Sequence, residues 1–355
     1  MRDSIQRIYG ALLTPSKLPD QIHLSQEELV EHIIHDEHFQ TYPPARSYQL
    51  KFWKHIVEKI ELANEEADER IYERHISLLS QGAPSPFDYM NGPPAPSYIT
   101  RFWNAPSSES NVRTSRRSIA LLESRTTIED GTTGMRTWRA SLILAEWLIR
   151  RPEIVQKKRV LELGSGVGFL GILIAQLDGM RKSKLDETHS GLRGVPSLAL
   201  TDVNRTVLER CENNISLPPN WFDATSLDRK ESLKAQLEEI NAEVIIGADI
   251  VYDLDLIHPL IETLGMALSA GSVSPQPYRR EGLIALCARS EETLSRFIQA
   301  ADSRGLDLRS EEWGSLGDDI FDDGWGGESQ SSVRLFTVTL RQSRGTTQKI
   351  LHSIS

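Results

Sequence analysis

Apolar and polar positions in the second half of the chain follow two alternating periods that predict an α/β fold. Four apolar runs are too brief for helices and fit buried parallel strands. They are Val160 to Leu163, Ser197 to Thr201, Glu243 to Ala248 and Leu283 to Cys287. Helical spacing of apolar residues follows each run. Val333 to Leu340 alternates and predicts a last strand, so the sequence predicts an α/β domain with a mainly parallel sheet within residues 111–345.

Residues 1–110 instead show helical spacing. Ser25 and Glu28 form a capping box, a second apolar stripe runs from Tyr48 to Ile60, and Glu65 to Leu79 predicts a third helix. Gln81 to Pro106 is rich in proline, glycine and serine and predicts a linker or irregular loop. We therefore expect a helical N-terminal module and linker over 1–110, with a role in substrate recognition or packing.

A glycine turn follows the strand that ends at Leu163. It reads Glu162-Leu163-Gly164-Ser165-Gly166-Val167-Gly168, and helical spacing resumes at Leu170. Glycine lets a ligand lie against the main chain, and the next helix points its first amide groups at that ligand. The third glycine comes two residues after the second, where a dinucleotide-binding turn has three. The pattern resembles methyltransferases that use S-adenosylmethionine (AdoMet), and an NAD-type oxidoreductase is the runner-up.

Asp202 ends the second strand, where a carboxylate can accept two hydrogen bonds from a ribose. It stands 202 − 164 = 38 residues after Gly164, whereas about 20 is usual. The polar stretch Asp178 to Pro196 accounts for the excess as a surface insertion. The alternative is a solvent-facing residue at a strand end, and the context favours ligand binding.

Two tryptophans are further candidates for the cofactor site. Trp138 follows a glycine-bearing loop in the first turn of a helix for which Thr137 is the expected N-cap, and it either lies over the cofactor or packs in the core. Trp221 stands where an aromatic side chain stacks on adenine. The third parallel strand is expected just before it, but Leu217 to Phe222 offers little apolar length.

The fourth strand ends at Ala248 and leads into Asp249-Ile250-Val251-Tyr252. This places a carboxylate and a phenol three residues apart at the carboxyl edge of the sheet, where ligands bind in such folds. Asp249 could orient an incoming ammonium group through charge-assisted hydrogen bonds, and Tyr252 could shape a narrow approach. Alternatively, Asp249 caps the next loop and Tyr252 belongs to the core.

Composition and charge narrow the partners. A chain of 355 residues with 39% hydrophobic and 25% charged residues is typical of a globular protein with room for two domains. The net charge of −10 argues against direct nucleic-acid binding. Cys211 and Cys287 lack metal-type spacing, and no run reaches membrane-spanning length, so we expect a cytoplasmic protein without membrane contact. The histidines of the first helices, His32, His35, His38 and His55, are expected to be solvated rather than metal ligands.

Three stretches together resemble one family. Thr137-Trp138 with Leu144-Ala145-Glu146, then Glu162 to Gly168, then Asp249 to Tyr252 resemble the seven-strand protein-lysine methyltransferases with a D-x-x-Y signature. Among these, the chain is most similar to the elongation factor 2 lysine methyltransferases, especially the fungal ones, whose helical N-terminal extension has a Phe-Trp segment like Phe52-Trp53. The resemblance implies a Rossmann-like, seven-stranded AdoMet-dependent methyltransferase domain and translation elongation factor 2 as the protein substrate.

The resemblance also assigns roles to residues. Asp249 and Tyr252 would be catalytic, and no metal is implied. The residues implied to contact AdoMet are Trp138, Gly164, Ser165, Gly166, Asp202, Trp221 and Ala248. Three alternatives stay open: a methyltransferase for nucleic acids or small molecules, an oxidoreductase, and a non-catalytic interaction protein on the same fold. The first often carries an Asn/Asp-Pro-Pro-Tyr loop, and the prolines are absent here.

Overall fold

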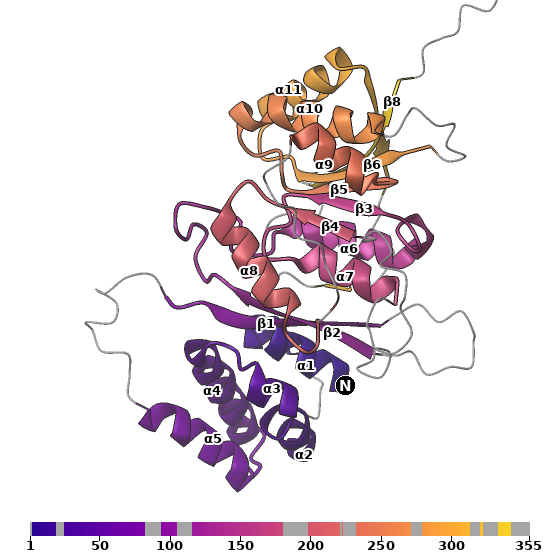
Figure 1. Cartoon of the computed structure of the whole chain (residues 1–355). Helices are drawn as coiled ribbons and strands as arrows, with labels where there is room; N and C mark the ends of the chain where they lie inside the picture. Colours follow the sequence, from indigo (N-terminus) through magenta and orange to yellow (C-terminus); the bar gives the residue numbers. More distant parts are fainter. Residues whose placement is uncertain are drawn as a thin grey trace, which may run out of the picture.

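The predicted sheet is present in the computed structural model. The structure describes residues 2–18, 25–81, 94–104, 116–179, 198–220, 222, 232–270, 279–312, 320–321 and 333–341. Within them, six strands form one sheet in the order β4-β3-β5-β6-β8-β7 (Figure 1). The strands are β3 (Val160–Leu163), β4 (Leu198–Thr201), β5 (Val244–Ala248), β6 (Glu281–Cys287), β7 (Leu306–Glu311) and β8 (Val333–Leu340). β4, β3, β5 and β6 are parallel, and β8 runs antiparallel between β6 and β7.

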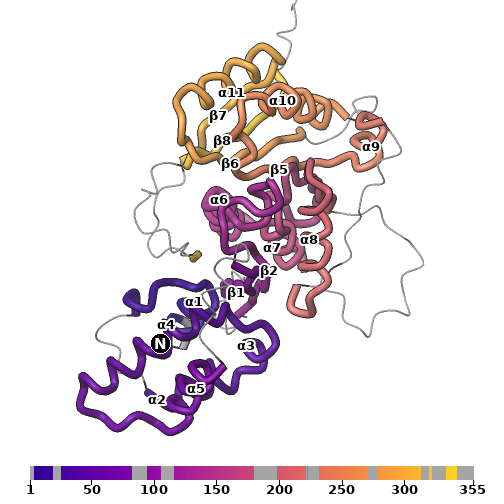
Figure 2. The backbone as a smooth tube through the Cα atoms, turned by 90° about the vertical axis from the view of Figure 1, so that its left-hand side faces the viewer, coloured from indigo at the N-terminus to yellow at the C-terminus, as the bar shows by residue number. Residues whose placement is uncertain are grey.

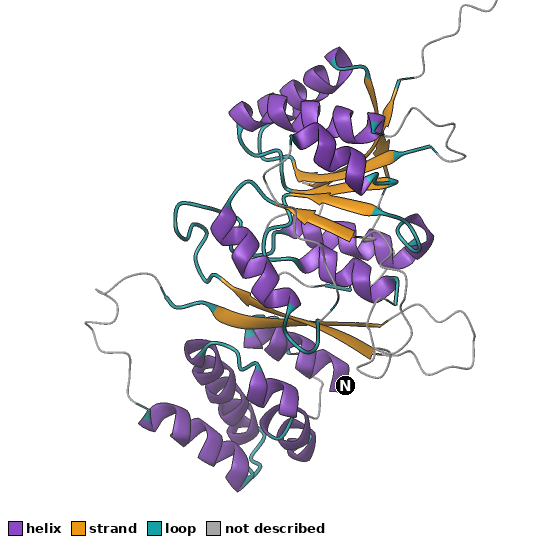
Figure 3. Cartoon of the chain, in the orientation of Figure 1, coloured by secondary structure: helices purple, strands orange, loops and turns teal. Residues whose placement is uncertain are grey.

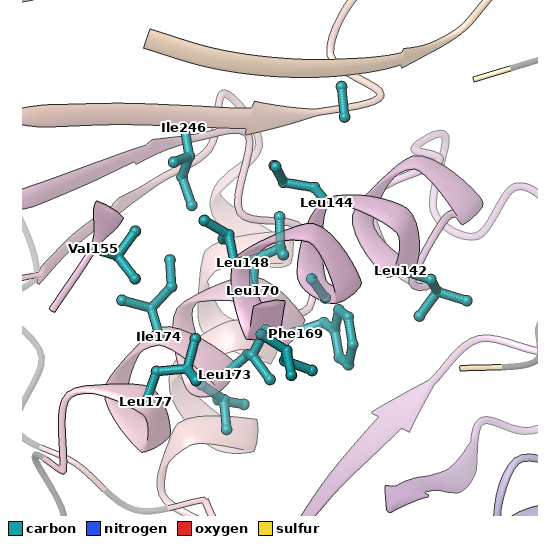
Figure 4. Packing of buried hydrophobic residues seen from close by; sticks show 14 of the residues in the cluster. Leu142, Leu144, Leu148, Val155, Phe169, Leu170, Leu173, Ile174, Leu177 and Ile246 are labelled. Atoms are coloured by element: carbon teal, nitrogen blue, oxygen red, sulfur yellow. The ribbon is translucent and has the colours of Figure 1, made fainter. Parts of the chain in front are cut away.

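Helices cover both faces of this sheet, which confirms the predicted fold class (Figure 2). One face carries α6 (Arg139–Arg150), α7 (Phe169–Leu177) and α8 (Arg205–Ile215). The other carries α9 (Leu233–Ile240), α10 (Leu254–Ser269) and α11 (Glu291–Ser303). A short 3₁₀ turn, η3 (Pro152–Ile154), follows α6. Figure 4 shows the core on the first face, where Leu144 and Leu148 of α6 lie beside Leu170 and Ile174 of α7.

The strand order reverses at β3, because the chain goes from β3 to β4 on one side and later to β5 on the other. Ligands of open α/β sheets bind at the carboxyl ends of the strands beside such a reversal. The third strand expected near Leu217 to Phe222 is not found in Leu217–Asn220, which form a turn. Trp221 and residues 223–231 lie outside the described residues.

The described helices of the N-terminal module share an apolar core of their own (Figure 3). They are α1 (Arg2–Gly10), α2 (Gln26–Leu29), α3 (Glu37–Thr41), α4 (Arg46–Leu62) and α5 (Glu69–Ser80), with a 3₁₀ turn η1 (Pro15–Lys17) and a π-helical turn η2 (Val30–Ile34). The Ser25 hydroxyl accepts a hydrogen bond from the Glu28 amide, as the capping signal predicts. The predicted third helix begins at Glu69, because the Asp68 carboxylate caps it.

The linker prediction is wrong for residues 97–104. These residues form β1 (Ser97–Asn104), which pairs antiparallel with β2 (Arg116–Glu123). Successive side chains of a strand point to opposite faces. Accordingly, Phe102 of β1 joins the core of the helical module and Trp103 joins the core of the large sheet. One strand of the N-terminal half therefore contributes to both cores.

His38 corrects a second expectation. Its Nε2 lies 2.8 Å from the hydroxyl oxygen of Thr100 in β1, and its ring lies 5.7 Å from the ring of Phe102. Burial lowers the pKa of His38, so the neutral imidazole helps to join α3 to β1 instead of facing solvent. Among the described helices, none combines the length and apolar character needed to cross a membrane.

Candidate active site

The turn between β3 and α7 requires glycine at its first position. Gly164 has φ of +68°, in the left-handed region that other residues rarely adopt. A Cβ atom there would lie 2.5 Å from the Cγ2 atom of Ile250. Because Gly164 has no side chain, the loops after β3 and β5 can approach each other closely. Main-chain atoms of the turn then line the base of a cavity.

Asp202 and the glycine turn hold each other in place. The amide of Ser165 donates to the Thr201 carbonyl at 2.7 Å, and the amide of Gly166 donates to Oδ2 of Asp202 at 3.2 Å. Oδ1 of Asp202 accepts from the Asn204 amide at 3.0 Å. Burial raises the pKa of Asp202, while these backbone amides oppose the shift. The carboxylate thus joins the ends of β3 and β4 and lines the cavity.

Glu162 is the most deeply buried acid of the site. It is 2% exposed, and its Oε2 atom has no hydrogen-bond partner among the described residues. Burial raises its pKa to about 8, against hydrogen bonding from Ser165 that lowers it. A buried polar atom without a partner is costly, and it suits a ligand that brings a hydrogen-bonding group. Sequence reasoning used Glu162 only as part of the turn pattern.

Trp138 forms a second wall of the cavity. It precedes the first residue of α6, and its Nε1 donates to the Thr133 carbonyl at 2.9 Å. The guanidinium groups of Arg136 and Arg289 lie 5.4 Å and 4.9 Å from its ring centroid. The expected N-cap role of Thr137 is wrong, because the Thr137 hydroxyl donates instead to Oε1 of Glu123 at 2.7 Å.

Asp249 is a buried carboxylate on a strained backbone. Its φ is +55°, which is uncommon for a residue with a Cβ atom, and the residue is 8% exposed. Oδ1 accepts from the Cys287 amide at 3.3 Å, and Oδ2 accepts from Nη2 of Arg289 at 2.9 Å. A carboxylate has about four lone-pair positions. Asp249 therefore keeps acceptor capacity toward the cavity that it lines.

Tyr252 stands at the mouth of the same cavity and is 50% exposed. Partial burial raises its pKa, the negative charge of Asp202 adds to the shift, and hydrogen bonding with Thr133 opposes it. The phenol therefore keeps its proton at neutral pH and cannot act there as a base. Its place at the entrance agrees with a role in shaping access.

One cavity of about 390 Å³ collects these groups. The structure brings together eight of the nine residues expected from the sequence, namely Trp138, Gly164, Ser165, Gly166, Asp202, Ala248, Asp249 and Tyr252. The ninth, Trp221, lies outside the described residues. Sequence reasoning missed Arg289, which follows the end of β6. The one sequence feature that could have indicated Arg289 as a site residue is its position two residues after Cys287, at the carboxyl edge of the sheet.

The chain is similar to known enzymes over this region. A family model described as lysine methyltransferase matches residues 120–304. Protein-lysine N-methyltransferase EFM3 of Chaetomium thermophilum is 28% identical over 313 residues, which cover 82% of this chain and 84% of the fungal protein. Protein-lysine N-methyltransferase EEF2KMT of Mus musculus is 31% identical over 206 residues, 54% of this chain and 56% of the mouse protein. The human protein of the same name is 27% identical over 79% of both chains. The match therefore spans little more than half of the mouse relative and most of the other two.

Proposed function

This chain belongs to the lysine methyltransferase family, and from that membership we propose that it transfers a methyl group from AdoMet to a lysine side chain of translation elongation factor 2. The observation that carries the proposal is the single cavity in which the glycine turn, Asp202, Asp249 and Tyr252 meet. The names of the fungal and mammalian relatives support elongation factor 2 as the substrate.

The residues around the turn fit AdoMet. Asp202 directly follows β4, where a carboxylate can receive two ribose hydroxyl groups. The unpartnered Oε2 of Glu162 provides a buried hydrogen-bonding atom for a ligand, and Trp138 provides an aromatic wall for a cationic one. When bound, AdoMet supplies a methyl group activated by its positively charged sulfur. The backbone of Gly164 and Gly166 leaves room for the ligand along the main chain.

Asp249 receives the lysine side chain. Its buried carboxylate forms charge-assisted hydrogen bonds with the arriving ammonium and aims the nitrogen at the methyl carbon. Arg289 already pairs with Oδ2 of Asp249, so the ammonium meets a partly neutralised acceptor. A nearby positive charge disfavours the charged form of an amine, whose ordinary pKa is about 10.4. The pair therefore holds the lysine while helping it to lose its proton to water.

Tyr252 limits the approach rather than moving a proton. Its ring is half exposed at the mouth of the cavity, and its raised pKa keeps the phenol protonated. A ring at that position admits an extended lysine side chain and excludes bulkier groups from the site. The four-carbon stem of lysine can then pass the ring while its nitrogen reaches Asp249.

The test uses purified protein, labelled AdoMet, purified elongation factor 2 and a lysate from cells that lack this gene. Wild type is compared with Asp249→Asn, which keeps the volume and tolerates positive φ, and with Asp253→Asn. Asp253 is the matched control, because it is an exposed acid of the same loop that caps α10. We expect labelled elongation factor 2 with wild type and the control, and a loss of at least about 100-fold with Asp249→Asn.

Other outcomes decide between the alternatives. Label on a different protein, with elongation factor 2 unlabelled, contradicts the proposed substrate and keeps the lysine methyltransferase activity. AdoMet binding without label on any protein favours a non-catalytic role. Equal labelling by wild type and Asp249→Asn removes Asp249 from the mechanism.

A further inference from the structure

Glu123, the last residue of β2, is buried between the helical module and the cavity. It is 2% exposed, and its two oxygens accept three hydrogen bonds. Oε1 accepts from Nη1 of Arg101 at 2.8 Å and from the Thr137 hydroxyl at 2.7 Å. Oε2 accepts from the Thr137 amide at 3.0 Å. The carboxylate therefore fastens the residue next to Trp138 to the end of the hairpin.

A backbone contact strengthens the same attachment. The amide of Ser124 donates to the Met135 carbonyl at 2.7 Å. Met135 is 1% exposed, so this bond is shielded from water. The segment that carries Arg136 and Trp138 to the cavity is thus attached to the end of β2 at two points. The position of Trp138 in the cavity therefore depends on the position of that strand end.

Arg101 of β1 also contacts a cavity-lining residue that follows the glycine turn. Its guanidinium lies 5.4 Å from the ring centroid of Phe169, the first residue of α7, which also lines the cavity. Arg101 is 8% exposed and shares its ion pair with Glu123 alone among the described acids. The buried guanidinium of Arg101 is therefore linked to the segment of Trp138 through Glu123. It also contacts Phe169, next to the glycine turn, directly.

We propose that Arg101 and Glu123 are positioning residues of the cofactor site. Through them, β1 keeps the segment of Trp138 and the first turn of α7 at Phe169 in the arrangement that binds AdoMet. This rests on the proposed function, because it assumes that AdoMet occupies the cavity. The N-terminal half then serves the cofactor site directly, in addition to any part in receiving the protein substrate.

The physical reason lies in the burial of the pair. Removing one member of a buried ion pair leaves the other charge without compensation, and the surrounding groups must move to solvate it. Without Arg101, Glu123 keeps only the nearby charge of Arg136, so its carboxylate shifts and loosens its hold on Thr137, and Phe169 loses its cation. The segment of Trp138 and the first turn of α7 then shift, although neither Arg101 nor Glu123 is among the residues that line the cavity.

The experiment measures AdoMet binding by calorimetry in the full chain. Arg101→Met removes the charge at similar length, Arg101→Lys restores a cation that can reach Glu123, and Thr137→Val removes only the hydroxyl. Arg117→Met is the matched control, because Arg117 lies on β2 of the same hairpin but stacks on Trp103 and bonds to the Gln176 carbonyl. Thermal unfolding is recorded for every variant.

We expect Arg101→Met to raise the Kd for AdoMet at least about tenfold, Thr137→Val to raise it in the same direction, and Arg101→Lys to recover part of the loss. In the methylation assay, the KM for AdoMet should rise while kcat at saturating AdoMet changes little. Arg117→Met should leave the Kd within about twofold, even where its unfolding temperature falls equally.

Two results overturn the inference. If Arg101→Met and Thr137→Val bind AdoMet like wild type, the pair has no role in the site. If Arg117→Met weakens AdoMet binding as much as Arg101→Met, the effect reflects general loosening of the hairpin. Should Arg101→Met fail to fold, Glu123→Gln takes its place, because it removes the charge that pairs with Arg101 at almost unchanged size and leaves the cavity-lining Thr137 in place. Wild type that binds no AdoMet refutes the proposed function together with this inference, whereas binding unaffected by the variants refutes the inference alone.

Discussion

Replacing Glu162 with glutamine should change how the stability of the protein depends on pH. The pKa of Glu162 is raised from 4.5 to about 8, because the carboxyl group is buried. The folded state thus favours the protonated form, so this stabilisation is complete below pH 4.5 and is lost as the pH rises through about 8. Glutamine has no proton to lose, and the variant should lack this component.

The size of the effect follows from the shift. The difference, 8 − 4.5 = 3.5 pKa units, corresponds to an upper limit of about 5 kcal/mol at about 1.4 kcal/mol per unit. Most of it falls between pH 5 and pH 8, where wild type should lose about 3 kcal/mol relative to the variant. The glutamine amide introduces its own penalty of about 1–3 kcal/mol, since Oε2 lies where no partner is available. That penalty does not vary with pH, so the slope is the informative quantity.

The assay is urea denaturation of both proteins without ligand, followed by circular dichroism at pH 5, 6, 7 and 8. Leu163→Met serves as the control, because this neighbour in β3 is buried and a volume-conserving change there has no ionisable group. Its unfolding free energy should run parallel to that of wild type. Parallel curves for wild type and Glu162→Gln across the same range would refute the reasoning about burial.

Substitutions at three further positions test other parts of the site. Gly164→Ala should lower the unfolding free energy by about 1–3 kcal/mol, because φ is +68° and Ile250 occupies the space of a Cβ atom. It should also weaken AdoMet binding at least about tenfold. Denaturation measures the first effect and calorimetry the second. Wild-type affinity there would contradict the close-approach argument. Arg289→Met should move the rise of kcat to higher pH, since an unshared Asp249 stabilises the charged form of the bound lysine; an unchanged pH profile of kcat would count against the proposed role of the pair. Tyr252→Phe should stay within about threefold of wild-type kcat, while Tyr252→Ala loses at least about tenfold, because the ring rather than the hydroxyl shapes the entrance. Equal losses in kinetic assays of both would assign the effect to the hydroxyl.

The parts of the fold that could be predicted from sequence are those with a strong local signal. The apolar runs at β3 and β5 and the turn at Gly164 each combine period, length and glycine within a few residues. β1 was missed although its residues Tyr98, Ile99 and Phe102 favour strands. The prolines before and after it suggested a loop, and the partner strand that stabilises it begins only at Arg116.

The electrostatic contacts of the site could not be predicted for a different reason. Arg289 lies 40 residues from Asp249, and Glu123 lies 14 residues from Thr137. Such pairs leave no periodic trace in the sequence, since only the folded sheet brings their atoms within hydrogen-bonding distance. Asp202 and Asp249 were found because strand ends are recognisable, whereas the residues that hold them were not.

The left-handed backbone of Asp249 has a consequence for laboratory evolution. At φ of +55° a glycine would relieve strain that is about 1–2 kcal/mol for a residue with a side chain. Glycine would also remove the acceptor for the Cys287 amide and for Arg289, so the relief of strain and the loss of these contacts oppose each other. A selection that rewards expression or heat resistance alone weighs only these two effects at position 249, so each round on this chain should also demand methyl transfer.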